Sequence, residues 1–141
     1  MANGAFNNYK NVLWGGNTAN FAMVDFDLDT IKATLVDHGV DTPVQATDED
    51  IADITAGARI ATATLGTKTI GVVANGTIDA VDTVFAAVSG ASVESFVVWK
   101  DTTVEATSPL MFQFDTATGL PVTPNGGDIT IQWNASGIAD I

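Results

Sequence analysis

The sequence predicts an all-β protein: an antiparallel β-sandwich of about eight strands, with either a jelly-roll or an immunoglobulin-like topology. Apolar and polar residues alternate with a period of two over much of the chain, and clusters of Gly, Asn, Asp or Pro interrupt the alternation. The composition, 46% hydrophobic and 16% charged, fits neither a disordered chain nor a long helical bundle. A length of 141 residues suits one domain with one continuous core.

The first two predicted strands, 21–29 and 30–37, follow each other closely. In the first, "FAMVDFDLD", one face is apolar and the other acidic, with Ala22, Val24, Phe26 and Leu28 opposed to Asp25, Asp27 and Asp29. In the second, "TIKATLVD", the inward face holds Ile31, Ala33 and Leu35. Both strands are therefore expected to cover the core with one face only.

At most one short helical turn is expected, near 48–54 in "TDEDIADI". Thr47 can cap its start, and the acidic residues that follow favour the positive end of a helix dipole. Ile51 and Ile54 are three residues apart and would face the core.

The remaining strands are expected at 58–65, 67–76, 83–90, 92–101, 109–115 and 128–134. The segment "SVESFVVWKD" (92–101) carries apolar groups on both faces, which predicts a central strand. Trp99 and Trp133 continue the inward registers of their strands, so core packing is preferred for both over a sugar-stacking platform.

The first twenty residues do not follow the strand pattern. Two interpretations stay open for 1–20: an extended N-terminal arm, or a frayed first strand or short helix, beside a single β domain at 21–141. Tyr9, Leu13 and Trp14 are candidate interface residues in this segment. Trp14 is the foremost candidate because it belongs to no strand register and Trp is enriched among interface anchors.

The net charge of -12 comes from 17 acidic and 5 basic residues, and the basic residues are scattered. Such a surface should repel nucleic acid and anionic lipid, so neither is an expected partner. The chain has no cysteine, and no basic, apolar leader is visible at its N-terminus. Synthesis in a reducing cytoplasm, without membrane insertion, is the expectation.

The stretch "DFDLD" imitates the opening of a calcium-binding loop. Such a loop requires Gly at position 6 and Glu at position 12, whereas Thr30 and Val36 stand there. We therefore predict a solvated strand face and no metal site or cofactor, with Asp25, Asp27 and Asp29 as weak candidates for a loosely held cation or a partner contact. A catalytic carboxylate pair is a further, weaker alternative.

His38, the only histidine, precedes a glycine in "VDHGV" and reads as a turn residue rather than a general base oriented by Asp37. No serine has a nucleophile motif around it, and "LGTKTIG" lacks the spacing of a phosphate-binding loop. The sequence therefore predicts a protein that is not an enzyme.

The stretch "FDTATGLPVTPNGGDITIQW" (114–133) resembles a family of small virion structural proteins of tailed bacteriophages, which share a "TATGLPVTPNGG" connector followed by a strand. The resemblance extends over roughly 22–134, through "DTIKATLVD" (29–37), "AGARIAT" (56–62) and "VVWKDT" (97–102). Segments 1–21 and 38–50 depart from the family's pattern.

The resemblance implies a virion structural protein, of the capsid decoration (cement) type as our first choice. Such a protein would sit on the capsid exterior and bind major capsid protein subunits and other copies of itself, as a homotrimer. Within the connector, prolines restrict the backbone, so Leu120 and Val122 are candidate interface residues. The alternatives are a tail or baseplate component and, in another class, a carbohydrate-binding module that uses exposed Trp and Asp residues.

Overall fold

The computed structural model describes residues 3–13, 23–72 and 74–140. In this part of the chain the protein is all-β, as predicted, with three antiparallel sheets of five, three and two strands. The main sheet has the order β1-β8-β7-β2-β3, with bounds Gly4–Ala5, Leu110–Phe114, Ser95–Lys100, Ile31–Val36 and Arg59–Thr64. The three-stranded sheet contains β10 (Ala139–Asp140), β5 (Thr77–Asp79) and β4 (Thr69–Ile70), and the two-stranded sheet contains β6 (Thr83–Phe85) and β9 (Ile129–Ile131).

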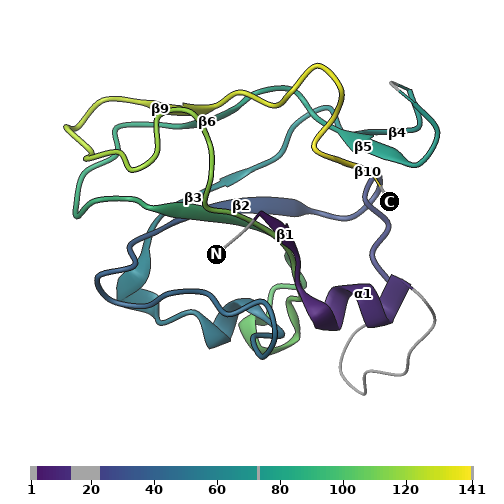
Figure 1. The fold of residues 1–141 in the computed structure, drawn as a ribbon, viewed down its shortest axis with the longest axis horizontal. Coiled ribbons are helices and arrows are strands. Elements are labelled where there is room, and N and C mark those ends of the chain that lie inside the picture. The colour runs from purple at the N-terminus through teal and green to yellow at the C-terminus, as the bar shows by residue number, and fades with distance from the viewer. Residues whose placement is uncertain (1–2, 14–22, 73, 141) are drawn as a thin grey trace.

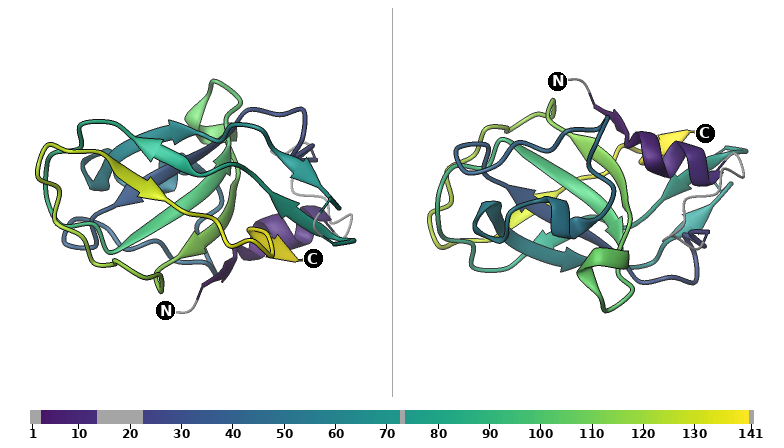
Figure 2. Two further views of the ribbon diagram at one scale, coloured as in Figure 1. Left: turned by 90° about the horizontal axis from the view of Figure 1, so that it is seen from above. Right: turned by 90° about the horizontal axis from the view of Figure 1, so that it is seen from below.

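The main sheet is covered on both sides (Figure 1). The two smaller sheets lie along one side, and Figure 2 (left) shows β6 and β9 crossing over the main sheet. The segment 37–58 and the short helices lie on the other side. This arrangement explains why consecutive residues of β2, β7 and β8 are buried instead of every second one.

The central position predicted for the "SVESFVVWKD" strand is confirmed. β7 is the middle strand of the main sheet, between β8 and β2, and Phe96 to Trp99 are all buried. The inward register predicted for β2 is also confirmed, because Ile31, Ala33 and Leu35 are at most 1% exposed. Its opposite face is buried as well, since Thr34 is 0% exposed and receives a hydrogen bond from the Trp99 indole (2.9 Å).

The strand predicted at 21–29 is wrong for the residues that the structure describes. Residues 26–28 form a turn, closed by a hydrogen bond from the Asp29 amide to the Asp25 carbonyl (2.8 Å). The aspartate side chains hold it, because Asp25 accepts from the Leu28 amide (3.1 Å) and Asp29 accepts from the Asp25 amide (2.7 Å). Phe26 is buried, as expected, but Leu28 is 82% exposed.

Helical structure exceeds the single turn that was predicted. The 3-10 helix η1 (Ile51–Asp53) lies at the predicted place, and Ile51 and Ile54 are buried. Its cap is Asp50 rather than Thr47, since Asp50 and Asp53 form a reciprocal capping box. The other helical elements are α1 (Asn7–Leu13), η2 (Ala56–Ala58) and η3 (Glu105–Thr107).

Residues 3–13 pack on the β domain. β1 pairs with β8 through Gly4 and Ala5, and Phe6, which follows, is 0% exposed. Tyr9 meets Phe112 edge to face at 5.3 Å between ring centroids. Of the two interpretations of the N-terminal segment, the described residues adopt a short strand and a short helix.

Candidate functional site

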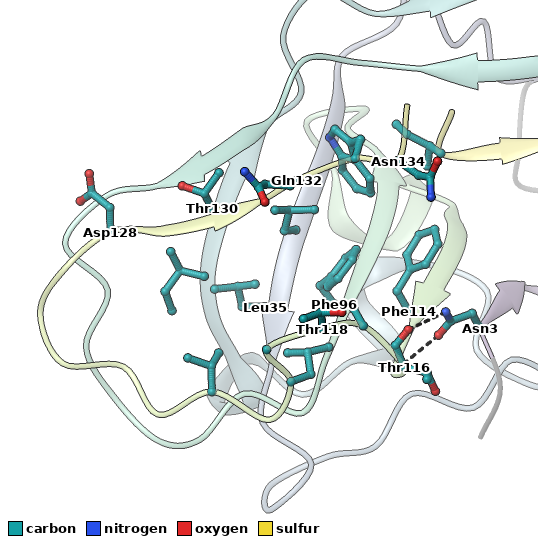
Figure 3. Close-up of a pocket in the computed structure, with 18 of the residues that line it drawn as sticks. Asn3, Leu35, Phe96, Phe114, Thr116, Thr118, Asp128, Thr130, Gln132 and Asn134 are labelled. Atoms are coloured by element: carbon teal, nitrogen blue, oxygen red, sulfur yellow. Dashed lines mark hydrogen bonds between the residues drawn. The ribbon is translucent and has the colours of Figure 1, made fainter. Parts of the chain in front are cut away.

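A groove of about 710 Å³ lies at one end of the sandwich (Figure 3). We call it the connector groove. Its floor is formed by Leu35, Phe96 and Phe114 of the main sheet. One wall is the connector, with residues 116–120 and Val122, and the other is the segment 128–134, which contains β9.

The floor is aromatic because the strand registers place aromatic residues side by side. Phe96 of β7 is the cross-strand partner of Phe114 of β8, and their rings stack at 5.0 Å between centroids. Trp133 closes the cluster with an edge contact to Phe96 at 5.8 Å, and its indole nitrogen donates to the Thr83 hydroxyl (3.2 Å). Phe114 and Trp133 are only partly buried, so the groove exposes apolar ring surface.

The connector wall is fixed at its start and at its middle. At its start, the Asn3 side chain accepts from the amides of Asp115 (2.8 Å) and Thr116 (2.9 Å) and donates to the Thr116 carbonyl (2.9 Å). At its middle, Val93 and Val122 exchange two backbone hydrogen bonds of 2.8 and 2.9 Å. A wall that is already ordered loses little conformational entropy when a ligand binds.

The end of the connector is a sharp reversal, as the sequence "PNGG" indicates. Gly126 has a φ of 87°, which a residue with a side chain rarely adopts. The Gly126 amide donates to the Val88 carbonyl (2.8 Å), and the Val88 amide donates to the Gly127 carbonyl (2.9 Å). These bonds direct the chain into β9.

The second wall presents the edge of a strand. Seven consecutive residues, 128–134, line the groove, although side chains alternate between the two faces of a strand. The backbone edge of this segment therefore borders the groove. In the described part of the chain β9 pairs only with β6, so its other edge has no neighbouring strand.

The lining has an uneven charge distribution. Asp128 is the only charged residue among the lining residues, which include no Lys or Arg. The Asp128 carboxylate accepts from the Ala87 amide (2.9 Å) and is exposed. The groove therefore suits a neutral or positively charged ligand better than an anion.

Two of the three aspartates of "DFDLD", Asp25 and Asp29, form hydrogen bonds or an ion pair. Asp29 pairs with the Lys100 ammonium at 2.9 Å. Partial burial would raise the pKa of Asp29, but the hydrogen bonds from Lys100 and the Asp25 amide outweigh it, so the pKa is lowered. Asp27 is exposed on the turn. Within residues 3–13, 23–72 and 74–140 there is no group of three His, Cys, Asp or Glu side chains that could hold a metal ion.

His38 has a partner that its local sequence does not indicate. Its Nε2 atom lies 2.7 Å from the Ser95 hydroxyl, whereas the Asp37 carboxylate accepts from the Gly39 amide (2.7 Å). Ser95 is 0% exposed on the central strand. A buried hydroxyl cannot reach a substrate in this conformation, so the pair is a packing contact between the loop after β2 and the start of β7.

The predicted interface residues lie in different environments. Tyr9 is buried in the core, and Leu13 is partly buried against it. Trp14 lies outside the described residues. Leu120 and Val122 are partly buried against the core and line the connector groove. Sequence reasoning did not find Phe114, Trp133 and the β9 edge as one site, because these elements meet only in the folded sheet.

In comparisons with known proteins, no family model and no curated protein matches this chain. Among the described residues, no helix is long and apolar enough to cross a membrane. The connector groove, with its aromatic floor and unpaired strand edge, is thus the strongest candidate for a functional site in the described part of the molecule.

Proposed function

We propose that this chain is a structural protein of a bacteriophage particle, and specifically a capsid decoration protein that bridges major capsid protein subunits on the shell exterior. The observation that carries the proposal is the stretch 114–133, whose sequence resembles that of small virion proteins of tailed phages. In the folded chain the connector within this stretch forms the fixed wall of an open groove, and residues 128–133 belong to the opposite wall.

Two physical properties support this role. A decoration protein stabilises a shell by burying area against neighbouring subunits, and a rigid loop beside an apolar groove offers such area at low entropic cost. The net charge of -12 also suits a position outside the shell, away from packaged DNA. As part of this proposal, the protein binds as a homotrimer.

The test is the number of copies of this protein in purified virions, measured by quantitative mass spectrometry against the major capsid protein. Decoration predicts hundreds of copies per particle. A few to tens of copies would instead indicate a tail or baseplate component, and absence from the particle would overturn the virion assignment altogether. The major tail and baseplate proteins of the same particle serve as internal standards.

A further inference from the structure

We propose that the connector groove binds an extended segment of a partner protein, which pairs as an added strand with the free edge of β9. The segment has apolar side chains at alternate positions and at least one flanking Lys or Arg. That the donor is a shell subunit rests on the proposed function; the mode of binding rests on the groove itself.

The wall formed by β9 has the geometry of a free strand edge. An unpaired strand edge presents a row of N–H and C=O groups, which is a template for pairing with another chain. β9 has β6 on one side and the groove on the other, and its central residue Thr130 is exposed. The segment 128–134 reads "DITIQWN" and so carries neither a lysine nor a proline of its own on this edge.

The floor of the groove offers apolar surface to an added strand. Side chains of an added strand alternate, so every second residue would point at the main sheet. There it would meet the ring surfaces of Phe114 and Trp133 and the side chain of Leu120, all partly buried. An incoming valine, isoleucine or leucine would complete their burial at about 25 cal/mol for each Å² of apolar surface removed from water.

The charge of the groove and of the whole chain favours a basic partner segment. The groove lining contains Asp128 and no basic residue, on a chain with a net charge of -12. An acidic or phosphorylated segment would be repelled over the whole approach, while a Lys or Arg beside the added strand would be attracted. The same repulsion disfavours a second copy of this chain as the strand donor.

The experiment compares two substitutions of the same type. Thr130→Lys places a positive charge on the β9 edge, and Thr64→Lys places one on β3, at an exposed position outside the groove. Circular dichroism and thermal unfolding first establish that both variants fold. Binding to a synthetic peptide, Lys-Val-Thr-Val-Thr-Val-Lys, is then measured by calorimetry, with a glutamate-flanked peptide of the same core as the comparison.

We expect the lysine-flanked peptide to bind the wild type and the Thr64→Lys variant alike, and to bind the Thr130→Lys variant at least about tenfold more weakly. In ¹⁵N-labelled protein, the amide signals of 116–120 and 128–134 should shift. Equal binding of both peptides would overturn the charge argument. No binding, shifts elsewhere, or competition by a neutral oligosaccharide would overturn the added-strand proposal.

A second experiment identifies which protein of the particle supplies the added strand. A photo-crosslinking residue at Thr130 should capture an extended segment of the major capsid protein, and one at Thr64 should not. Absence of the protein from virions would overturn its assignment to the shell but leave the peptide result intact. Crosslinks from Thr64 but not from Thr130, in particles that contain the protein, would overturn the groove as the attachment site.

Discussion

Trp99 and Trp133 are residues of the same type that differ in burial, so comparing them shows how burial alone affects stability. Both indole nitrogens donate to a threonine hydroxyl, Trp99 to Thr34 at 2.9 Å and Trp133 to Thr83 at 3.2 Å. Trp99 lies on the central strand and is 7% exposed, whereas Trp133 borders the groove and is only partly buried. Their contributions to stability should therefore differ, although the sequence pattern placed both in the core.

We predict that Trp99→Phe lowers the free energy of unfolding by about 1–3 kcal/mol, because it removes a buried hydrogen bond and leaves unfilled volume. Trp133→Phe should cost less than about 1 kcal/mol, since water can reach the site. Urea unfolding followed by circular dichroism measures both. Equal losses would show that the groove side of the cluster is as well packed as the central strand.

At the scale of elements, the alternating pattern correctly predicted the strands that lie inside the main sheet. It failed for segments whose conformation depends on pairing with another strand or on hydrogen bonds to nearby side chains. β2, β7 and β8 follow their predicted segments, because their own side chains supply the buried faces. The alternation at 25–29 equally suits a strand, but the Asp25 and Asp29 carboxylates bind nearby amides and close a turn.

Short strands escaped prediction for a different reason. β1 and β10 have two residues each, and they are strands only because β8 and β5 lie beside them. The groove could not be predicted from local sequence either, since Asn3, Leu35, Phe96 and the stretch from the connector to β9 are far apart along the chain. The connector's rigidity was readable from its prolines and glycines, but what it faces was not.

The N-terminal segment supplies a prediction at this scale. Phe6 links β1 to α1 and is 0% exposed, so Phe6→Ala should lower the free energy of unfolding by about 3–5 kcal/mol. Phe6→Leu retains most of the apolar volume and should cost much less. Chemical denaturation of both variants provides the measurement. A loss below about 1 kcal/mol for the alanine variant would mean that residues 3–13 are peripheral to the fold.

The excess of acidic over basic residues dominates the electrostatics of the whole molecule. Among the residues that the structure describes, ion pairs join Lys32 to Asp101, Arg59 to Glu105 and Lys100 to Asp29. These partners lower the pKa of Asp101 and Glu105, and of Asp29 against its partial burial. Beside η1 the pKa of Asp50 is instead raised, mainly by partial burial and secondly by the charge of Asp53.

The two groups of carboxylates predict a stability maximum in mildly acidic solution. A carboxylate whose pKa is lowered by folding stabilises the folded state above its ordinary pKa, and this contribution is lost as the pH falls below about 4. Asp48 and Asp50 have raised pKa values, chiefly from burial, so folding is favoured as the pH falls from neutrality through those values. Unfolding midpoints in urea should therefore rise as the pH falls from 7 toward about pH 4 and fall at still lower pH.

The double variant Asp48→Asn and Asp50→Asn tests whether these two carboxylates cause the gain in stability as the pH falls from 7. Asparagine can still accept from the Val44 and Ala52 amides, which now donate to Asp48 and Asp50 at 2.7 and 2.9 Å. The variant should be more stable than the wild type at pH 7 and should gain less on moving to pH 5. A control with Asp27→Asn and Asp79→Asn removes the same number of charges elsewhere, so an equal effect there would assign the pH dependence to net charge rather than to the η1 cluster.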